Sequence, residues 1–323
     1  MKKLITLFLL LFLFTTVFAD KRSVDLNYNQ KLQINANNSQ KLSLETSFSE
    51  IQFLDVNTKE GEFTELFLPG AYATGKLGTP KLPAIKKLIE IPFGAKVEVN
   101  VVDYEVTQYD LTTLGISNKI LPNQPSPPKN LDPEDIKFEY KAEIYQQNRY
   151  ISYELAQTKI LGVLRGKRLA RLELAPISYN PVENKIKVYN NLQIEINFIG
   201  SDQAFTSAKY RSTYSPYFEP VYDKIINNRV DHNYPDHPDL TKYPVKYLIV
   251  SDRMFESTLQ PFIEWKTKKG FEVIVAYTDV IGSSVSDIQT WIHDQYNAGT
   301  TEDPAPTFGL LVGDVTQVRA SDT

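Results

Sequence analysis

Hydrophobic and polar residues alternate along much of the chain between residues 24 and 198. The alternation is clearest in residues 97–101, 170–174 and 192–198, where every second side chain is apolar. A period of two with a single apolar phase is typical of strands that bury one face. The 19 Tyr and 17 Phe residues also suit the pleated surface of a sheet. This part of the chain is therefore predicted to be a mainly antiparallel β-sandwich.

The alternation changes phase after Val101. Val102, Tyr104 and Val106 continue the apolar series one residue out of step with the residues before them. A one-residue shift moves an apolar set to the opposite face of a sheet. We therefore predict a β-bulge near Val101 and Val102, or a strand that changes sheets there.

Turn-forming residues separate the predicted strands. Asn180 and Pro181 begin one predicted turn, and Asn190 and Asn191 form another, because Asn tolerates the left-handed conformation and Pro presets φ. Gly166 marks a further bend or bulge. Short strands separated by such turns favour the sandwich.

Two proline-rich stretches are predicted to lack regular structure. Residues 121–128 read LPNQPSPP and form an excursion from the sheet, and residues 201–244 contain five prolines among scattered charges. The second stretch is typical of an interdomain connector. The predicted organisation is a signal peptide at residues 1–19, a β-sandwich domain at 20–205, the connector at 206–244 and an α/β domain at 245–323.

The hydrophobic period changes after the connector. Residues 245–250 predict a short buried strand, and a helix follows that Ser251 or Asp252 can cap and that Gly270 ends. An apolar stripe along this helix predicts that it packs on a sheet.

Further elements alternate between strand and helix up to the end of the chain. Pro261 is unfavourable inside the first helix, so the helix is either kinked there or regular only from about Thr258. Residues 271–277 and 308–312 predict strands, and residues 284–287 (SVSD) predict a capping box on the helix between them. This order implies a parallel sheet with right-handed crossovers.

The first residues have the three-part layout of a secretory signal peptide. Lys2 and Lys3 precede an apolar stretch at residues 4–18, and small residues allow cleavage between Ala19 and Asp20. The alternative is an uncleaved membrane anchor, but the stretch is shorter than the roughly 20 residues that a spanning helix needs. We therefore expect an exported protein without a membrane span, in the periplasm, at the cell surface or secreted.

Composition limits the kinds of partner and the interactions that can stabilise the fold. The formal charge of −4 becomes −6 once Lys2 and Lys3 are removed, and this acidic balance argues against nucleic acid as a partner. The chain has no cysteine, so no disulfide stabilises it. About 300 residues can form two buried cores.

Several segments resemble gingipain-type cysteine peptidases, peptidase family C25. The segments in the second half are residues 247–250 (YLIV), 262–266 (FIEWK), 269–271 (KGF) and 310–314 (LLVGD). Those in the first half are residues 92–95 (PFGA), 162–166 (GVLRG) and 176–181 (PISYNP), which resemble the propeptide of that family. The order of signal peptide, propeptide and peptidase domain also fits.

The resemblance implies an exported endopeptidase that acts on protein or peptide substrates and is made as an inactive precursor. It implies a caspase-like α/β domain, a propeptide that packs on its own catalytic domain, and calcium in the complete peptidase domain. A cysteine thiolate and a histidine would perform the chemistry. The family carries both beyond the strand that ends at Gly313 and Asp314, and His293 lies in a predicted helix, unlike the family's loop histidine. No residue of this chain is therefore assigned a catalytic role, and the chain as given is expected to be inactive.

Two acidic sites have open interpretations. Asp314 follows a buried strand, where α/β folds place functional groups, so it either supports an active site or metal ion or forms a turn. Residues 231–232 (DH) and 236–239 (DHPD) offer mixed ligands for a metal, but their spacing matches no zinc motif and they lie in the connector. A solvated linker is the alternative for this cluster.

Basic residues gather at two places. Arg165, Lys167, Arg168 and Arg171 surround a predicted β-turn, where they either dock on an acidic surface of the catalytic domain or form a solvated hairpin edge. The connector contains further lysines and arginines, and exposed connectors are where proteolysis concentrates. Because family precursors are cut after basic residues in this segment, Arg211 and Arg229 are the predicted processing sites; a plain tether is the alternative.

Two functions follow from these observations. The first is the precursor of a gingipain-like cysteine endopeptidase, in which the β domain assists folding and covers the active site. The second is an exported, non-enzymatic β-sandwich that binds a protein or glycan and is followed by a degenerate α/β remnant.

Overall fold

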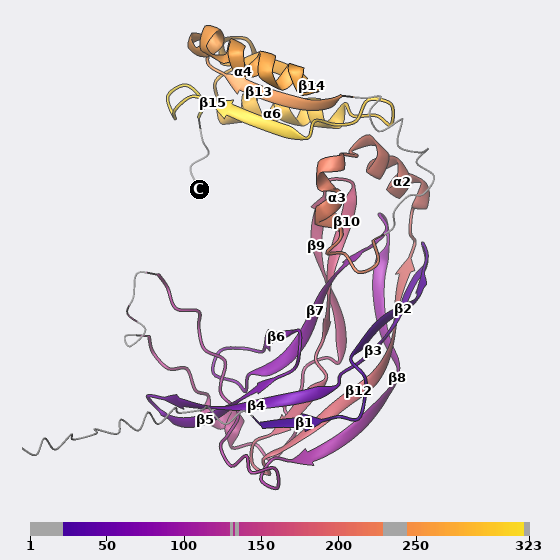
Figure 1. The fold of residues 1–323 in the computed structure, drawn as a ribbon, viewed down its shortest axis with the longest axis vertical. Coiled ribbons are helices and arrows are strands. Elements are labelled where there is room, and N and C mark those ends of the chain that lie inside the picture. Colours follow the sequence, from indigo (N-terminus) through magenta and orange to yellow (C-terminus); the bar gives the residue numbers. More distant parts are fainter. Residues whose placement is uncertain (1–21, 130–131, 133–135, 229–243, 320–323) are drawn as a thin grey trace, which may run out of the picture.

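The computed structural model describes residues 22–129, 132, 136–228 and 244–319. Figure 1 shows a long body of antiparallel strands, a group of short helices at one end of it, and a small α/β layer beyond those helices. We call these parts the β body (residues 22–199), the strap (residues 203–228) and the α/β unit (residues 244–319). The predicted signal-cleavage position between Ala19 and Asp20, together with Arg229 and both Asp-His clusters, lies outside the described residues.

The strands of the β body follow the alternating segments. They are β1 (Arg22–Asp25), β2 (Lys31–Asn37), β3 (Lys41–Ser47), β4 (Glu50–Thr58), β5 (Gly61–Phe67), β6 (Ala71–Thr74), β7 (Leu82–Glu90), β8 (Lys96–Asp110), β9 (Ala156–Leu164), β10 (Lys167–Leu174), β11 (Ile177–Asn180) and β12 (Lys185–Ile199), with a short helix α1 (Ala142–Tyr145). In the described residues they form three antiparallel sheets, ordered β1-β4-β5, β6-β7-β10-β9 and β11-β12-β3-β2, with β8 paired to β12. The predicted antiparallel architecture is confirmed.

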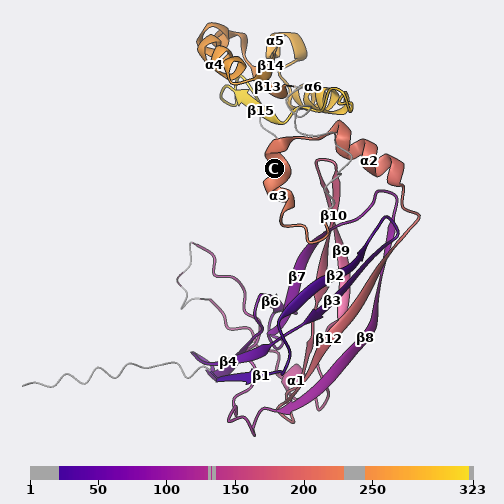
Figure 2. The same ribbon diagram turned by 45° about the vertical axis from the view of Figure 1, so that its right-hand side comes forward.

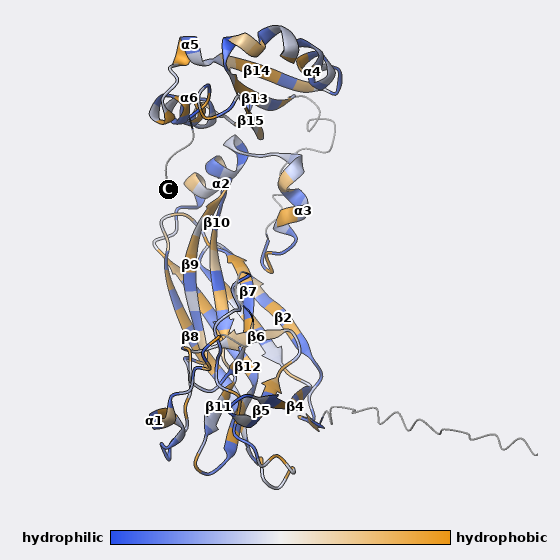
Figure 3. Cartoon of the chain, turned by 90° about the vertical axis from the view of Figure 1, so that its left-hand side faces the viewer, coloured by the Kyte–Doolittle hydropathy of each residue, from blue (hydrophilic) through white to orange (hydrophobic). Residues whose placement is uncertain are grey.

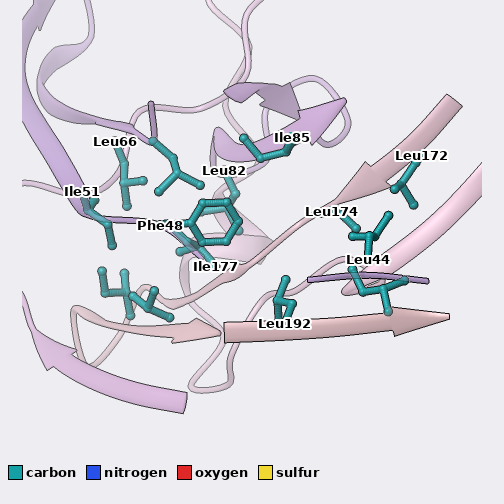
Figure 4. Packing of buried hydrophobic residues seen from close by; sticks show 14 of the residues in the cluster. Leu44, Phe48, Ile51, Leu66, Leu82, Ile85, Leu172, Leu174, Ile177 and Leu192 are labelled. Atoms are coloured by element: carbon teal, nitrogen blue, oxygen red, sulfur yellow. The ribbon is translucent and has the colours of Figure 1, made fainter. Parts of the chain in front are cut away.

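Side chains from these sheets meet in one large core. Leu192, Ile194 and Ile196 on β12 are at most 1% exposed, whereas the residues between them face outward. Figure 4 shows Phe48 of the β3–β4 turn among side chains that include Leu82 and Ile177. Bands of hydrophobic and hydrophilic residues alternate along β9 and β10 in Figure 3. Burial of the apolar phase therefore stabilises the body, as the period of two predicts.

The predicted bulge is present on β8. Val101 pairs with Ile194 and Asp103 pairs with Gln193, so Val102 is the extra residue. A second irregularity, on β12 between Asn190 and Gln193, restores the register by Glu105. The apolar residues after Val101 therefore lie on the outer face: Val102, Tyr104 and Val106 are each between 45% and 58% exposed. The phase change along the sequence therefore corresponds to a change of face within one strand.

The turn predicted at Asn190 and Asn191 is wrong, because β12 continues through both residues. Asn191 adopts a left-handed φ of 50° within a second irregularity of the β8–β12 ladder. The side-chain amide of Asn190 donates to the Phe48 carbonyl and its oxygen accepts from the Phe48 N–H, each at 2.9 Å. The left-handed preference of Asn is used here in a bulge, where β12 exchanges β11 for β3 as its neighbour.

The other turns are as predicted. Asn184 (φ 51°) closes the β11–β12 hairpin, and Arg165 (φ 51°) precedes Gly166 in the β9–β10 hairpin. Residues 121–128 form irregular structure, and Gln124 closes this excursion by exchanging two side-chain hydrogen bonds with the backbone of Glu139, at 2.8 and 3.0 Å.

Irregular structure was predicted from residue 201, and this is wrong for most of residues 203–222, whereas residues 223–228 form turns and an isolated bridge. The strap contains α2 (Gln203–Ser212), η2 (Pro216–Phe218) and α3 (Glu219–Tyr222). The Asp202 carboxylate accepts from the Phe205 N–H at the start of α2, and prolines open the two short helices. Proline is favoured at the first positions of a helix, where its missing N–H costs nothing. The prolines therefore start helices instead of breaking them.

The α/β unit has the predicted order of elements. Its strands are β13 (Val245–Ser251), β14 (Phe271–Tyr277) and β15 (Phe308–Val312), and its helices are η4 (Arg253–Phe255), α4 (Glu256–Lys268), α5 (Thr278–Ile281) and α6 (Val285–Asn297). The strands pair in parallel in the order β14-β13-β15, which confirms the parallel sheet.

The predicted helix ends of the α/β unit are also present. Asp252 caps η4, Gly270 takes a left-handed φ of 88° after α4, and Ser284 and Asp287 form the capping box of α6. Helix α4 starts at Glu256 and runs through Pro261, so its regular part begins before Thr258. Among the described residues, no helix is both long and apolar enough to cross a membrane.

Candidate interdomain docking site

The tip of the β9–β10 hairpin is the point where the β body, the strap and the α/β unit meet. Gly166 lies so close to α2 that a Cβ there would be 2.5 Å from the Tyr210 Cα and 2.6 Å from the Thr213 hydroxyl oxygen. Only glycine allows this approach. The preceding residue, Arg165, points its side chain away from the hairpin and into the junction.

The Arg165 guanidinium binds three backbone carbonyls from two parts of the chain. Nε donates to the Thr213 oxygen at 2.9 Å, Nη1 to the Pro306 oxygen at 3.0 Å and Nη2 to the Ala305 oxygen at 3.2 Å. Thr213 is the C-cap of α2, where the helix dipole favours a cation. Burial lowers the pKa of Arg165 from its ordinary value, but a guanidinium remains protonated in proteins.

Aromatic rings enclose the same guanidinium. Its central carbon lies 4.8 Å from the ring centroid of Phe218 in the strap and 5.7 Å from that of Tyr296 in the α/β unit. A planar guanidinium both stacks on rings and donates in several directions. Arg165 therefore links three segments that are distant in sequence.

Further contacts join the strap to the α/β unit. The Ala305 N–H donates to the Ser212 carbonyl at 2.8 Å, and the Thr307 and Ser215 hydroxyls are 2.9 Å apart. The Tyr217 ring lies 5.9 Å from Phe271 and 5.0 Å from Phe308, between centroids. Such ring pairs contribute about 0.5–1.5 kcal/mol each beyond their area burial.

A buried ion pair holds the strap on the β body. Lys167 Nζ lies 2.8 Å from Glu90 Oε2, and these side chains are only 2% and 13% exposed. The ammonium lies 4.6 Å from the ring centroid of Tyr210 and 5.0 Å from that of Tyr222. Both rings belong to the strap, and Tyr222 also packs on Leu169 of β10. The cation is therefore shared between a carboxylate of the body and the rings of the strap.

Neither interpretation of the basic group was correct in detail. Arg165 does dock on the α/β unit, but its acceptors are carbonyls and not an acidic surface. Lys167 is buried, and Arg168 donates to the carbonyls of Pro92 and Ala95 at 3.0 and 2.8 Å. Arg171 agrees best with the alternative prediction of a solvated hairpin edge. It is 36% exposed and is ion-paired with Glu173 at 2.7 Å.

Asp314 lies in an exposed turn directly after β15. Its carboxylate accepts from the Val315 N–H at 2.7 Å, and its carbonyl accepts from the N–H groups of Gln317 and Val318 at 2.9 Å. Within the described ranges, no three His, Cys, Asp or Glu residues gather in a way that could hold a metal ion. The geometry is that of a turn former, and a role in metal binding stays a prediction.

The remaining predicted positions are in helices or outside the described part. Arg211 lies in the last turn of α2, a conformation that must unwind before a protease can cleave it. Its role in processing stays a prediction. His293 lies in α6, as its predicted helix requires.

Alkaline titration should report on the buried tyrosines of the docking site and of the β-body core. Burial raises the pKa of the phenols of Tyr145, Tyr179, Tyr210 and Tyr222, to about 12 for Tyr222. Because the unfolded phenols ionise near pH 10, stability that is present below pH 10 is lost as the pH rises toward the folded-state value. We expect phenolate absorbance to rise in two steps, with the second step following loss of circular dichroism. A single step near pH 10 in the folded chain would contradict this.

Known proteins resemble the chain over both of its parts. The propeptide model Propeptide_C25 matches residues 25–217, and the model of peptidase family C25 matches residues 240–321. Lys-gingipain HG66 of Porphyromonas gingivalis is 40% identical over 267 residues, which are 82% of this chain and 15% of the relative. Gingipain R1 of the same organism is 24% identical over 275 residues, 84% of this chain and 26% of the relative.

A solved structure agrees with the sequence relatives. It concerns the zymogenic latency of gingipain K from Porphyromonas gingivalis and superposes with a TM-score of 0.54 and 36% identity, covering 56% of this chain and 100% of that chain. This chain spans 15% of the length of the Lys-gingipain relative. The propeptide match covers almost all of the β body, all of α2 and most of η2, and the peptidase match covers the parallel strands. The chain therefore belongs to the gingipain family, peptidase family C25, and consists of that family's propeptide followed by the first part of its peptidase region.

Proposed function

We propose that this chain is the amino-terminal part of an exported, gingipain-like cysteine endopeptidase precursor. In this precursor the β body and strap guide the folding of the peptidase region and keep it inactive until the connection is cut. The observation that carries the proposal is the docking site, where Arg165 of the propeptide binds the carbonyls of Ala305 and Pro306 in the peptidase region. The family matches on both sides of residues 218–239 favour this precursor over a non-enzymatic binding module.

The proposed chemistry is divided between this chain and the rest of the peptidase region. A thiolate and a histidine supplied by the rest of the region would cleave protein or peptide substrates, and the described residues position the first strands of the sheet that carries them. Calcium is proposed for the complete peptidase region on the strength of the family resemblance, and none of its ligands is assigned to a residue of this chain. We propose that this chain is exported, because residues 1–19 have the layout of a secretory signal peptide.

Processing is proposed to occur after the strap. The Ile226 N–H donates to the Leu88 carbonyl at 3.0 Å, and the Asn227 side chain exchanges hydrogen bonds with the backbone of Glu90 at 2.7 and 2.9 Å. These bonds, together with helix α2 around Arg211, protect the chain before residue 229. Cleavage after Arg229 is therefore favoured over cleavage after Arg211.

The test compares the full-length precursor with a version from which residues 22–228 are removed. The complete precursor should be soluble, inactive on labelled casein, and active after an arginine-specific protease has cut the connector. The shortened version should accumulate as insoluble or inactive protein, because its parallel sheet loses the docking site. Equal activity of the shortened version, without cutting, would contradict the proposal.

A further inference from the structure

We infer that the propeptide docks on the amino-terminal edge of the peptidase sheet and leaves the carboxyl-terminal edge open, so that docking and latency belong to different parts of the propeptide. This inference rests on the proposed function. It assigns the docking surface, which consists of Arg165, Ser212, Thr213, Ser215 and Tyr217, to one partner: the peptidase region of the same precursor.

The contacts fall on one edge of the parallel sheet. Phe271 and Phe308, which contact Tyr217, are the first residues of β14 and β15. Residues 305–307, which bind Arg165, Ser212 and Ser215, directly precede β15. In Figures 1 and 2 the strap lies beneath this sheet, and in Figure 1 the arrowhead of β15 points away from the strap. Because the strands are parallel, all of these residues share the amino-terminal edge.

The opposite edge is the one where chemistry is expected. In open α/β sheets, ligands bind outside the carboxyl ends of the strands, which are Ser251, Tyr277 and Val312 in this unit. Strand β13 has seven residues, so the two edges are separated by about 20 Å. A side chain of the docking surface is too short to span that distance. Docking at this surface therefore cannot itself block a substrate at the carboxyl-terminal edge.

The docking surface remains whole on the propeptide when the connector is cut. Thr213 binds Arg165 of the body, Tyr222 packs on Leu169, and Asn227 binds Glu90. A cut after residue 228 severs none of these contacts, and it severs none of those to residues 305–307. The cut propeptide is therefore expected to stay bound until the contacts themselves dissociate.

The experiment uses the full-length precursor with Arg165→Gln and, separately, Tyr217→Ala. Two readouts are taken for each variant: the activity of the uncut precursor on labelled casein, and the dissociation rate of the propeptide after the connector is cut. Loss of charge-assisted hydrogen bonds should raise the dissociation rate of the Arg165 variant at least about tenfold, while the uncut precursor stays as inactive as wild type. Arg165→Lys should slow the dissociation of the propeptide only in part relative to Arg165→Gln. A lysine keeps the positive charge but lacks the planar guanidinium that donates to several carbonyls at once.

Arg171→Gln is the matched control, since Arg171 lies on the same hairpin but binds only within it; it should behave as wild type in both readouts. Activity of an uncut Arg165 or Tyr217 variant would overturn the inference, because the docking surface would then maintain latency. Unchanged dissociation in both variants would overturn it as well. The proposed function fails separately, if cutting the wild-type precursor yields no peptidase activity.

Discussion

Replacing Lys167 by methionine is expected to lower the free energy of unfolding by about 3–5 kcal/mol. The substitution leaves Glu90 with its charge but without its partner, and the Glu90 side chain is only 13% exposed. It also removes the cation between the rings of Tyr210 and Tyr222, so the strap should loosen together with the body. Denaturant unfolding followed by circular dichroism measures the change.

A double variant separates the unpaired charge from the loss of packing. Lys167→Met combined with Glu90→Leu should recover most of the lost stability, since apolar replacements of buried ion pairs are often neutral or stabilising. Arg171→Met removes a half-exposed arginine from a pair on the same strand, and it should cost less, because the Glu173 carboxylate, although also 13% exposed, still accepts a hydrogen bond from Gln157 at 3.3 Å. Equal losses for the Lys167 and Arg171 variants would show that burial of the pair does not matter.

Gly166→Ala should displace helix α2 from the hairpin. The new methyl group would lie 2.5 Å from the Tyr210 Cα and 2.9 Å from the Lys209 carbonyl oxygen, both of which are backbone atoms. Overpacking of this kind costs about 1–3 kcal/mol, and a displaced α2 moves Thr213 away from Arg165. We expect lower stability and faster cleavage after Arg211 by an arginine-specific protease.

Gly309 provides the control for this substitution. A Cβ at Gly309 would have no atom within 4 Å, so Gly309→Ala should leave both stability and the cleavage rate close to wild type. If Gly166→Ala behaved in the same way, the close approach of hairpin and strap would not constrain the docking site.

Local signals predicted much of the fold. Alternation located the strands of the body, and the phase change at Val102 located a bulge, because a pleated strand forces every second side chain onto one face. Capping chemistry placed the ends of helices, as at Ser284 and Gly270. The errors came from residues whose preference fits two structures. Pro216 starts a helical turn as readily as it ends a helix, and Asn191 fits a bulge as well as a turn.

The docking site was less predictable. A basic group was evident in the sequence. The acceptors of Arg165, however, are backbone carbonyls, which every residue has, so the residue types give no sign of them. Nothing in the sequence distinguishes Tyr217 from the other tyrosines. Its partners Phe271 and Phe308 become neighbours only when the parallel strands pair. The sequence does offer one retrospective signal: a glycine directly after an arginine at a hairpin tip, which permits close approach by another backbone.

The reciprocal bonds between Asn190 and Phe48 have a consequence for strand alignment. Alternation penalises a shift of one residue between β3 and β12, but a shift of two residues returns every apolar side chain to the core. Asn190 faces Phe48 only in the native alignment, where its amide completes both hydrogen bonds of that residue. A shifted pairing would leave these buried polar groups without partners. A single amide thus distinguishes two alignments that hydrophobicity cannot tell apart.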